Sequence, residues 1–314
     1  MDMKPILKVL LFLFVVVLLD QCERDEPNPK VNIPDENFLN ALIEQGVDIN
    51  GDSIINHTEA EAINCLWIIN LNINDLKGIE AFVNLDKLHC NRNKLTNLDV
   101  SKNIKLIELG CFYNKLITLN LPNTTSLKRL LCYGNNLTSL DVKNNTDLLI
   151  LSCGDNQITG LDISKCKVLE GLDCSDNQIT SLDISNNPGL SYLDCSSNLL
   201  TTLDVSKNKA LKYLDCGGNT LTSLDVSNNT ALGFLYCGGN QFTNLDISDN
   251  VAIGTLPNFS GFAFSYPVEI PDLDISNMPA LYEVCVWEMP FPPAGILIDI
   301  TGSPNVYFTT DCSK

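Results

Sequence analysis

Histidine is scarce in this sequence, and the motifs that usually accompany catalysis are missing from it. The 314 residues include only two histidines, His57 and His89, so few side chains could act as general bases near neutral pH. His89 adjoins Cys90, but neighbouring residues of an extended strand face opposite sides and cannot form a catalytic pair. The sequence contains no phosphate-binding loop, nucleophile elbow or paired-cysteine zinc motif. It therefore predicts a protein that is not an enzyme.

Basic residues are scarce as well. Lys and Arg number 20 against 38 Asp and Glu, which gives a net charge of −18. Nucleic acids and anionic membrane surfaces attract clustered Lys and Arg, so this balance argues against both as partners. It is compatible with cations, with basic patches on proteins and with neutral glycans.

A hydrophobic run long enough to cross a bilayer is also missing. The apolar run from Ile6 to Leu19 is shorter than the roughly 20 residues that a spanning helix needs, and Lys4 and Lys8 flank or enter it. This pattern predicts an export signal over residues 1–21 and an unstructured tether over residues 22–32, beginning with Cys22. An ordinary secretory peptide that is cleaved nearby is the alternative.

The segment around Cys22 resembles a bacterial lipoprotein signal, in which the cysteine is lipidated and becomes the mature N-terminus. The acidic residues that follow resemble the surface-export signal of lipoproteins in the Bacteroidetes group. Leu19-Asp20-Gln21 departs from this pattern, because small residues usually precede the cysteine. The resemblance implies an exported protein at the outer membrane or cell surface, held there by a lipid anchor on Cys22.

Cysteines recur at a fixed interval of 21 residues through the middle of the chain. They are Cys90, Cys111, Cys132, Cys153, Cys174, Cys195, Cys216 and Cys237. A period this strict predicts a solenoid whose coils stack on one another. Within the period Leu85–Lys105, Leu88 and Cys90 alternate in and out, as do Leu98 and Val100. We therefore expect a mainly β solenoid over residues 64–250, with two short parallel strands in each 21-residue coil.

The pattern L-x-x-L-x-C-x-x-N-x-L resembles the leucine-rich repeat, and the cysteine column is similar to internalin-type repeats of bacterial surface proteins. The resemblance implies that the asparagine after each cysteine turns inward and satisfies backbone groups at the bend. These asparagines are Asn93, Asn114, Asn135, Asn156, Asn177, Asn198, Asn219 and Asn240. A second asparagine column follows the other half of each coil, and Cys166 replaces the asparagine once.

The cysteine column itself fits neither disulfides nor a metal. Neighbouring coils lie about 4.8 Å apart with parallel side-chain directions, which leaves the Cβ atoms farther apart than a disulfide prefers. Zinc sites use paired ligands at C-x-x-C spacing, and the sequence has no such pair. We expect these cysteines to be small hydrophobic residues of the core.

Residues 33–63 predict a helical cap at the N-terminal end of the solenoid. Residues 33–47 have the apolar face of a helix, and residues 48–59 then resemble an EF-hand loop. Its oxygen donors for Ca²⁺ would be Asp48, Asn50, Asp52, Ile54 through its carbonyl group, Asn56 and Glu59. Ser53 stands where glycine normally makes the sharp turn. The alternative is a polar turn without an ion.

The outward positions of the first strand gather aromatic and acidic residues in the later coils. These residues are Tyr192, Tyr213, Phe234, Tyr236, Asp173, Asp194 and Asp215, and a smaller aromatic cluster comprises Phe112, Tyr113 and Tyr133. Rings beside carboxylates suit either a protein-binding hot spot or sugar stacking. The alternative is that the rings only pair across strands and stabilise the sheet. We predict that this strand face meets solvent and binds a ligand.

After Asn250 the register slips. Leu273-Asp274-Ile275-Ser276 repeats the pattern of a second half seven residues late, and prolines punctuate residues 251–314. We expect irregular repeats and a C-terminal cap there, with a possible second binding loop around Phe259 to Tyr266. The leading functional hypothesis is protein recognition or adhesion at the cell surface through the strand face. Glycan capture for nutrient uptake and a structural role in the envelope are the alternatives.

Overall fold

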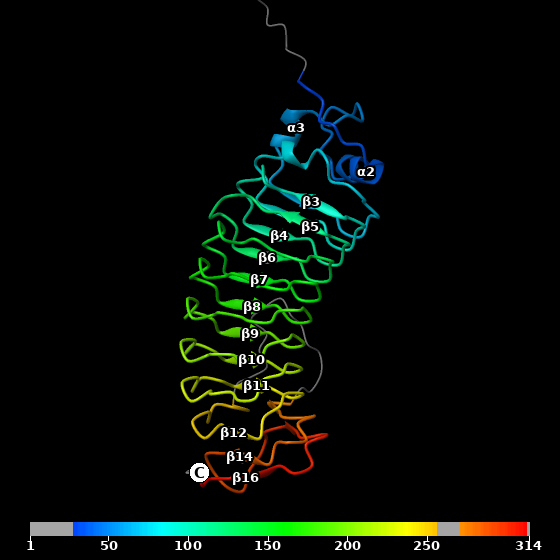
Figure 1. Ribbon diagram of the computed structural model, residues 1–314. Coiled ribbons are helices and arrows are strands. Elements are labelled where there is room, and N and C mark those ends of the chain that lie inside the picture. Colours follow the sequence, from blue (N-terminus) through cyan, green and yellow to red (C-terminus); the bar gives the residue numbers. More distant parts are fainter. Residues whose placement is uncertain (1–27, 256–270, 313–314) are drawn as a thin grey trace, which may run out of the picture.

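The computed structural model describes residues 28–255 and 271–312, and these form a single elongated stack of coils (Figure 1). Helices lie at the N-terminal end of the stack, and short strands run across successive coils down to the C-terminal end. The expected signal over residues 1–21, the lipidated Cys22 and the loop from Phe259 to Tyr266 lie outside the described residues.

The first half of each coil contributes one strand to a parallel sheet of eleven strands. The register is regular over the 21-residue coils: Leu172 pairs with Leu193, and Leu193 pairs with Leu214. Side chains one period apart therefore stand side by side in columns, as the cysteine spacing predicts. The strands are β1 (Cys65–Trp67), β2 (Lys87–His89), β4 (Glu108–Gly110), β6 (Arg129–Leu131), β7 (Ile150–Ser152), β8 (Gly171–Asp173), β9 (Tyr192–Asp194), β10 (Tyr213–Asp215), β11 (Phe234–Tyr236), β13 (Leu273–Asp274) and β15 (Ile298–Asp299).

The second halves of the coils form strands only near the two ends of the stack. One pair consists of β3 (Asn97–Asp99) and β5 (Thr118–Asn120), and a triplet consists of β12 (Asn244–Asp246), β14 (Glu283–Cys285) and β16 (Tyr307–Thr309). Between β5 and β12, all within the described residues, the expectation of a second strand in each coil is wrong. Leu182 and Ile184 are buried and Asp183 is exposed there, as in a strand. Alternation specifies which side chains are buried, but it does not specify whether neighbouring backbones come within hydrogen-bonding distance.

The interior is filled by leucine, isoleucine, valine and the cysteine column. All eight cysteines of the column are fully buried, and none of them forms a disulfide. Burial in apolar surroundings raises the pKa of the Cys90 thiol to about 12, so this thiol stays protonated near neutral pH. The prediction that these cysteines act as small hydrophobic core residues is confirmed.

The asparagine column provides the polar part of the interior. The Asn177 side-chain amide donates to the carbonyls of Cys153, Cys174 and Ser175, and its oxygen accepts from the Ile158 N–H at 2.8 Å. One side chain thus satisfies backbone groups in two neighbouring coils, which confirms its expected role.

The second asparagine column works in the same way. The Asn208 amide donates to the carbonyls of Ile184 and Asn187 in the preceding coil. Cys166, which stands in for asparagine, points its sulfur at the carbonyl of Asn145 at 3.6 Å and is buried. A thiol is a weak hydrogen-bond donor, so the turn is kept with less polar stabilisation.

The N-terminal cap contains α2 (Glu36–Glu44), α3 (His57–Glu61) and the short 3-10 helix η1 (Ile79–Ala81). Helix α2 is shorter than the expected span of residues 33–47 and begins after Asp35, whose carboxylate accepts from the Phe38 N–H. Phe38 is fully buried against Phe82, with ring centroids 6.4 Å apart, so α2 covers the open end of the core. No helix in the described residues has the length and apolar character needed to cross a membrane.

The C-terminal coils depart from the 21-residue period but keep both sheets. Leu273-Asp274 has the sequence of a second half, yet the structure pairs it with Leu235-Tyr236 in the main sheet. The expected placement is therefore wrong: β12 occupies the second sheet, and the next strand, β13, takes the following position in the main sheet. The main sheet then ends at β15 and the second sheet at β16.

Candidate functional site

The aromatic residues expected on the solvent side of the later coils are buried. Tyr192, Tyr213, Phe234 and Tyr236 are only 3 %, 5 %, 3 % and 7 % exposed. Tyr192 and Tyr213 stack with ring centroids 4.5 Å apart and planes 11° apart, and Tyr236 meets Tyr213 edge to face at 5.3 Å. The expectation of exposed rings is wrong here, because residues one period apart stand directly opposite and their rings cover one another.

The aspartates beside these rings are also withdrawn from solvent. Asp173 and Asp194 are buried, and Asp215 is partly buried. Ser152 and Ser175 donate to Asp173, Ser196 donates to Asp194, and the Gly217 N–H donates to Asp215. Burial raises the pKa of all three carboxyl groups, that of Asp215 to about 7.

The smaller aromatic cluster is the more accessible of the two. Phe112 and Tyr133 stack at 4.6 Å, and Tyr113 meets Tyr133 edge to face at 5.1 Å. Tyr113 is 48 % exposed, and the Arg92 guanidinium lies 5.7 Å from its ring centroid. A Cβ atom on Gly134 would lie 2.4 Å from the Tyr113 ring, so the tyrosine leans over a glycine of the next coil.

Trp67 extends the accessible aromatic residues toward the N-terminal cap. It is 53 % exposed and stacks on the His89 ring at 4.1 Å. His89 lies 3.4 Å from Glu108, which also lies 3.7 Å from Arg129. Burial lowers the pKa of His89 below its ordinary value. We call Trp67, Phe112, Tyr113 and Tyr133 the aromatic surface; sequence reasoning had not included Trp67, although it begins the column that continues with His89.

A cavity of about 490 Å³ opens at the ends of β10, β11 and β13. Its lining includes the carboxylates of Asp215 and Asp274 and the rings of Tyr213 and Tyr236. The Tyr236 hydroxyl donates to the Pro271 carbonyl at 2.6 Å, which fixes that ring. The remaining lining is Ser196, Ser197, Pro271, Ser276, Asn277 and the glycines at positions 217, 218, 238 and 239. Only Tyr213, Tyr236 and Asp215 of this lining had been expected from the sequence.

The glycines explain why the cavity lies in these two coils. Gly217-Gly218 and Gly238-Gly239 occupy the positions that hold Phe112-Tyr113 and Ser196-Ser197 in other coils. Gly218 and Gly239 have φ angles of 62° and 70°, in the left-handed region. Two successive coils thus lack the side chains that fill this corner elsewhere. Consecutive Gly-Gly pairs one period apart are the sequence signal that could have located the cavity.

The loop over residues 48–59 wraps its side chains inward in the way that an EF-hand loop does. The Asp48 carboxylate accepts from the Gly51 and Ser53 N–H groups, both at 2.8 Å, and Glu59 accepts from the Ile49 N–H. Ser53 has a φ of 61°, so it adopts the left-handed conformation that glycine normally supplies.

The three acidic side chains of this loop are not gathered tightly around one point. Within the described residues, the only three acidic, cysteine or histidine groups whose ligand atoms all lie within 4.8 Å are Asp246, Cys285 and Cys312. Asp48, Asp52 and Glu59 are therefore not gathered that closely. The Asn56 side chain accepts from the Glu59 N–H and the Glu59 side chain accepts from the Asn56 N–H, a reciprocal cap of α3.

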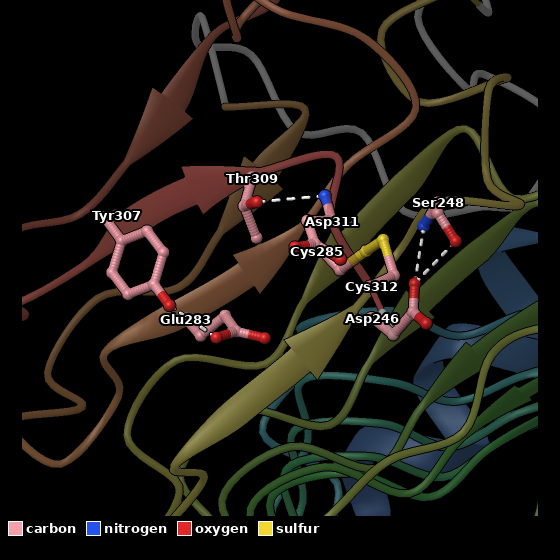
Figure 2. The surroundings of a disulfide bond; sticks show 8 residues. All are labelled: Asp246, Ser248, Glu283, Cys285, Tyr307, Thr309, Asp311 and Cys312. Carbon is pink, nitrogen blue, oxygen red and sulfur yellow. Dashed lines mark hydrogen bonds between the residues drawn. A yellow bond between two sulfur atoms is a disulfide. The ribbon is translucent and has the colours of Figure 1, made fainter. Parts of the chain in front are cut away.

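Sequence reasoning missed a disulfide at the C-terminal end. Cys285 and Cys312 are bonded across 27 residues, and Figure 2 shows the bond beside the Asp246 carboxylate. Asp246 accepts from the Ser248 N–H and hydroxyl, and the Tyr307 hydroxyl donates to Glu283. Because the two sulfurs are joined, the group formed with Asp246 is a cross-link and not a set of thiolate ligands. The equal spacing of Asn258, Cys285 and Cys312 was the available signal.

A family model for leucine-rich repeats in two copies matches residues 167–208. The functional domain of InlJ from Listeria monocytogenes, which includes a cysteine ladder, is similar over 88 % of this chain and 70 % of that chain, at 27 % identity and a TM-score of 0.51. The fold is a leucine-rich repeat solenoid. The leucine-rich repeat domain of APL1B is similar over 75 % of this chain and 70 % of that chain, at 20 % identity and a TM-score of 0.51.

A leucine-rich repeat protein from Leptospira interrogans aligns over 56 % of this chain and 55 % of that chain, at 25 % identity and a TM-score of 0.47. Among curated proteins, none matches the sequence. Leucine-rich repeat proteins generally mediate protein–protein interaction, and their solenoids are typically non-enzymatic. The comparisons identify the fold of this chain and do not identify its binding partner.

Proposed function

We propose that this leucine-rich repeat solenoid is a non-enzymatic recognition protein of the cell surface that binds a protein partner through the aromatic surface. The observation that carries the proposal is the exposure of Trp67 in β1 and of Tyr113 in the bend after β4, 53 % and 48 %. Large rings lose little conformational entropy on binding and are enriched at the centres of protein interfaces. Trp67 stacks on His89 and Tyr113 meets Tyr133 edge to face, and these contacts hold the rings in place before a partner arrives.

The charges around the aromatic surface favour a protein partner over a glycan. Arg92, Glu108 and Arg129 lie beside the rings, so both signs of charge are presented within a few strands. Mixed charges around an aromatic centre provide electrostatic complementarity to another protein, whereas a neutral sugar gains little from them. Glycan capture and an architectural role are retained as outcomes of the test.

The test compares binding to a panel of host extracellular-matrix proteins with binding to a glycan array. The double variant Trp67→Ala, Tyr113→Ala is expected to lose at least tenfold in affinity for a protein that the wild type binds. The matched control is Tyr282→Ala, Tyr307→Ala, because each of these rings is 48 % exposed but lies on the side of β14 and β16. Binding to glycans alone would replace the proposal with glycan capture, and equal loss in both variants would remove the aromatic surface from it.

We also propose that the protein is exported and lipid-anchored through Cys22, which lies outside the described residues. The support is the sequence pattern around that cysteine and its charged, proline-containing continuation. Mass spectrometry of the mature N-terminus is expected to find an acylated cysteine at position 22. An unmodified N-terminus elsewhere would contradict the anchor without affecting the binding proposal.

The cap loop is proposed to bind Ca²⁺ and thereby to stiffen the N-terminal end. The support is the inward wrapping of Asp48 and Glu59 and the left-handed conformation of Ser53. Both oxygens of Asp48 and the Oε2 atom of Glu59 accept from one backbone N–H each, so each keeps a second lone pair for coordination, whereas Glu59 Oε1 already accepts from two.

A further inference from the structure

The cavity at the ends of β10, β11 and β13 contains two carboxylates without a cation. Asp215 and Asp274 both line it, and the lining contains no Lys or Arg. Among the residues that the structure describes, none of the ion pairs involves either carboxylate. Asp215 accepts from the Gly217 N–H, and Asp274 accepts from the Ser276 N–H. One oxygen of each carboxylate is thereby fixed in place, and the other is left to a ligand.

The volume of the cavity suits a small group. Its volume of about 490 Å³ lies within the usual range for ligand pockets. The glycine pairs remove side chains from its floor, and a Cβ atom on Gly238 would lie 2.8 Å from Asp274 Oδ1. Adding any side chain at position 238 would crowd the carboxylate. The floor is therefore backbone, which allows close approach.

The aromatic walls add a second preference. Tyr213 and Tyr236 line the cavity, and both are held in place by ring contacts with each other. Aromatic rings attract organic cations, and a planar guanidinium can bond to a carboxylate while it packs on a ring. A divalent metal fits less well, because Asp215 and Asp274 are not part of any described group of three acidic, cysteine or histidine ligands within 4.8 Å.

We infer that this cavity binds an organic cation of the guanidinium class, with Asp215 and Asp274 as its anionic partners and Tyr213 and Tyr236 as its walls. The guanidinium can come from an arginine side chain of a protein or from a free small molecule. The cavity and the aromatic surface share no residue, so this inference does not depend on the proposed function.

The electrostatic surroundings predict a pH dependence for such binding. Asp215 is faced by Asp194 on the neighbouring strand β9 and by Asp173, Asp176 and Asp274, and no described Lys or Arg offsets them. Burial together with these charges raises the pKa of Asp215 to about 7. Because the ionised carboxylate is the form that binds a cation, affinity is expected to rise between pH 5 and pH 8.

The test uses isothermal titration calorimetry of the full chain with three probes: ethylguanidinium, a blocked Gly-Arg-Gly peptide and the same peptide with citrulline. The arginine peptide is expected to bind at least tenfold more tightly than the citrulline peptide, and more tightly at pH 8 than at pH 5. Tighter binding of the peptide than of ethylguanidinium would assign the site to a protein side chain, and equal binding would assign it to a small cation.

Two variants locate the binding. Asp215→Asn is expected to weaken binding of the arginine peptide at least tenfold, whereas Asp225→Asn is not. Asp225 is an exposed aspartate of the same coil, and like Asp215 it accepts from the backbone N–H two residues later. Gly218→Tyr is expected to fill the cavity and abolish binding. The chain tolerates this arrangement elsewhere, because Tyr113 has a φ of 52° and leans over Gly134, as a tyrosine at 218 would lean over Gly239.

Absence of binding by ethylguanidinium and by the arginine peptide would overturn the inference. Binding that Asp215→Asn and Gly218→Tyr leave unchanged would overturn it as well. If Gly218→Tyr did not fold, Asp215→Asn would still test the inference, because it removes the carboxylate and keeps the side-chain shape.

Discussion

At the scale of single residues, the same few side-chain arrangements recur in successive coils of this protein. A leucine or cysteine fills the interior, and an asparagine bonds to the backbone of two coils. The same spacing makes outward neighbours stack, which is why Tyr192 and Tyr213 bury each other instead of meeting solvent. Each residue is thus determined as much by its equivalents 21 positions away as by its neighbours in sequence.

The asparagine column can be tested at one position. Asn177→Ala removes the amide that donates to three backbone carbonyls and leaves the Ile158 N–H without its acceptor. We expect a loss of roughly 2–4 kcal/mol in the free energy of unfolding, because buried groups would be left unsatisfied. Urea denaturation followed by circular dichroism measures it. Asn186→Ala is the control, since Asn186 is exposed, and an equal effect of the two would contradict the assigned role.

At the scale of elements, the two ends of the stack are stabilised in different ways. The N-terminal end is covered by α2 and by the loop that leads into α3. At the C-terminal end, the disulfide between Cys285 and Cys312 ties β14 of the second sheet to the residues just after β16, the last strand of that sheet (Figure 2). A solenoid needs such ends because its terminal coils have a neighbour on one side only.

The calcium proposal is tested through Glu59. In Glu59→Gln, glutamine can keep the reciprocal cap of α3 but cannot supply a bidentate carboxylate. We expect Ca²⁺ at 100 times its Kd to stabilise the wild-type cap by about 2.7 kcal/mol, and to leave the variant unchanged. Thermal unfolding with and without chelator measures this. Glu61→Gln, an exposed change in the same helix, should respond like the wild type; equal responses of all three would contradict a site in this loop.

The disulfide is tested by the double variant Cys285→Ser, Cys312→Ser. Closing a 27-residue loop restricts the unfolded chain, so its removal should cost about 3–4 kcal/mol in the chain-entropy account. The loss should concentrate in β14 and β16, which hydrogen exchange resolves. Unchanged protection of these strands would show that packing alone holds this end. The control is Cys65→Ser, an exposed free cysteine at the other end.

At the scale of the whole molecule, acidic residues occupy two different environments. Asp183, Asp204 and Asp225 in the second halves are exposed, and hydrogen bonds from the serine two residues later lower their pKa values. Asp173, Asp194 and Asp215 on the strand face have raised pKa values because of burial. The net charge of −18 assumes that every one of these carboxyl groups is ionised.

Stability is therefore expected to fall as the pH rises from about 4 to about 7. The unfolded aspartates lose their protons near pH 3.9, whereas folded Asp215 keeps its proton up to about 7, so the folded state binds more protons across this interval. Each such group contributes up to about 1.4 kcal/mol per pH unit. Below pH 4 the exposed carboxylates, with lowered pKa values, act in the opposite direction.

Thermal unfolding between pH 4 and pH 8 measures this dependence, and Asp215→Asn should reduce it. The matched Asp225→Asn should leave the slope between pH 5 and pH 7 unchanged, because the pKa of Asp225 is lowered, below that interval. A melting temperature that rises steadily to pH 8 in the wild type would contradict the assignment of raised pKa values to the strand face.

The sequence alone determined the columns of this molecule. A strict period of 21 residues predicts stacked coils, buried cysteines and inward asparagines, because each coil contacts only its neighbours and the same local packing repeats. Local patterns also located the cap, although helix α2 proved shorter than expected.

Only the tertiary structure decided which outward side chains are exposed, which cysteines are bonded and where a cavity forms. Whether Tyr192 is exposed depends on the rings beside it, and the pairing of Cys285 with Cys312 depends on β14 and β16 lying side by side in the second sheet. The cavity exists because Gly218 and Gly239 lie together in neighbouring coils and leave space beside Asp215. Exposure, cross-links and cavities result from contacts between segments, and a repeat pattern read along the chain does not specify them.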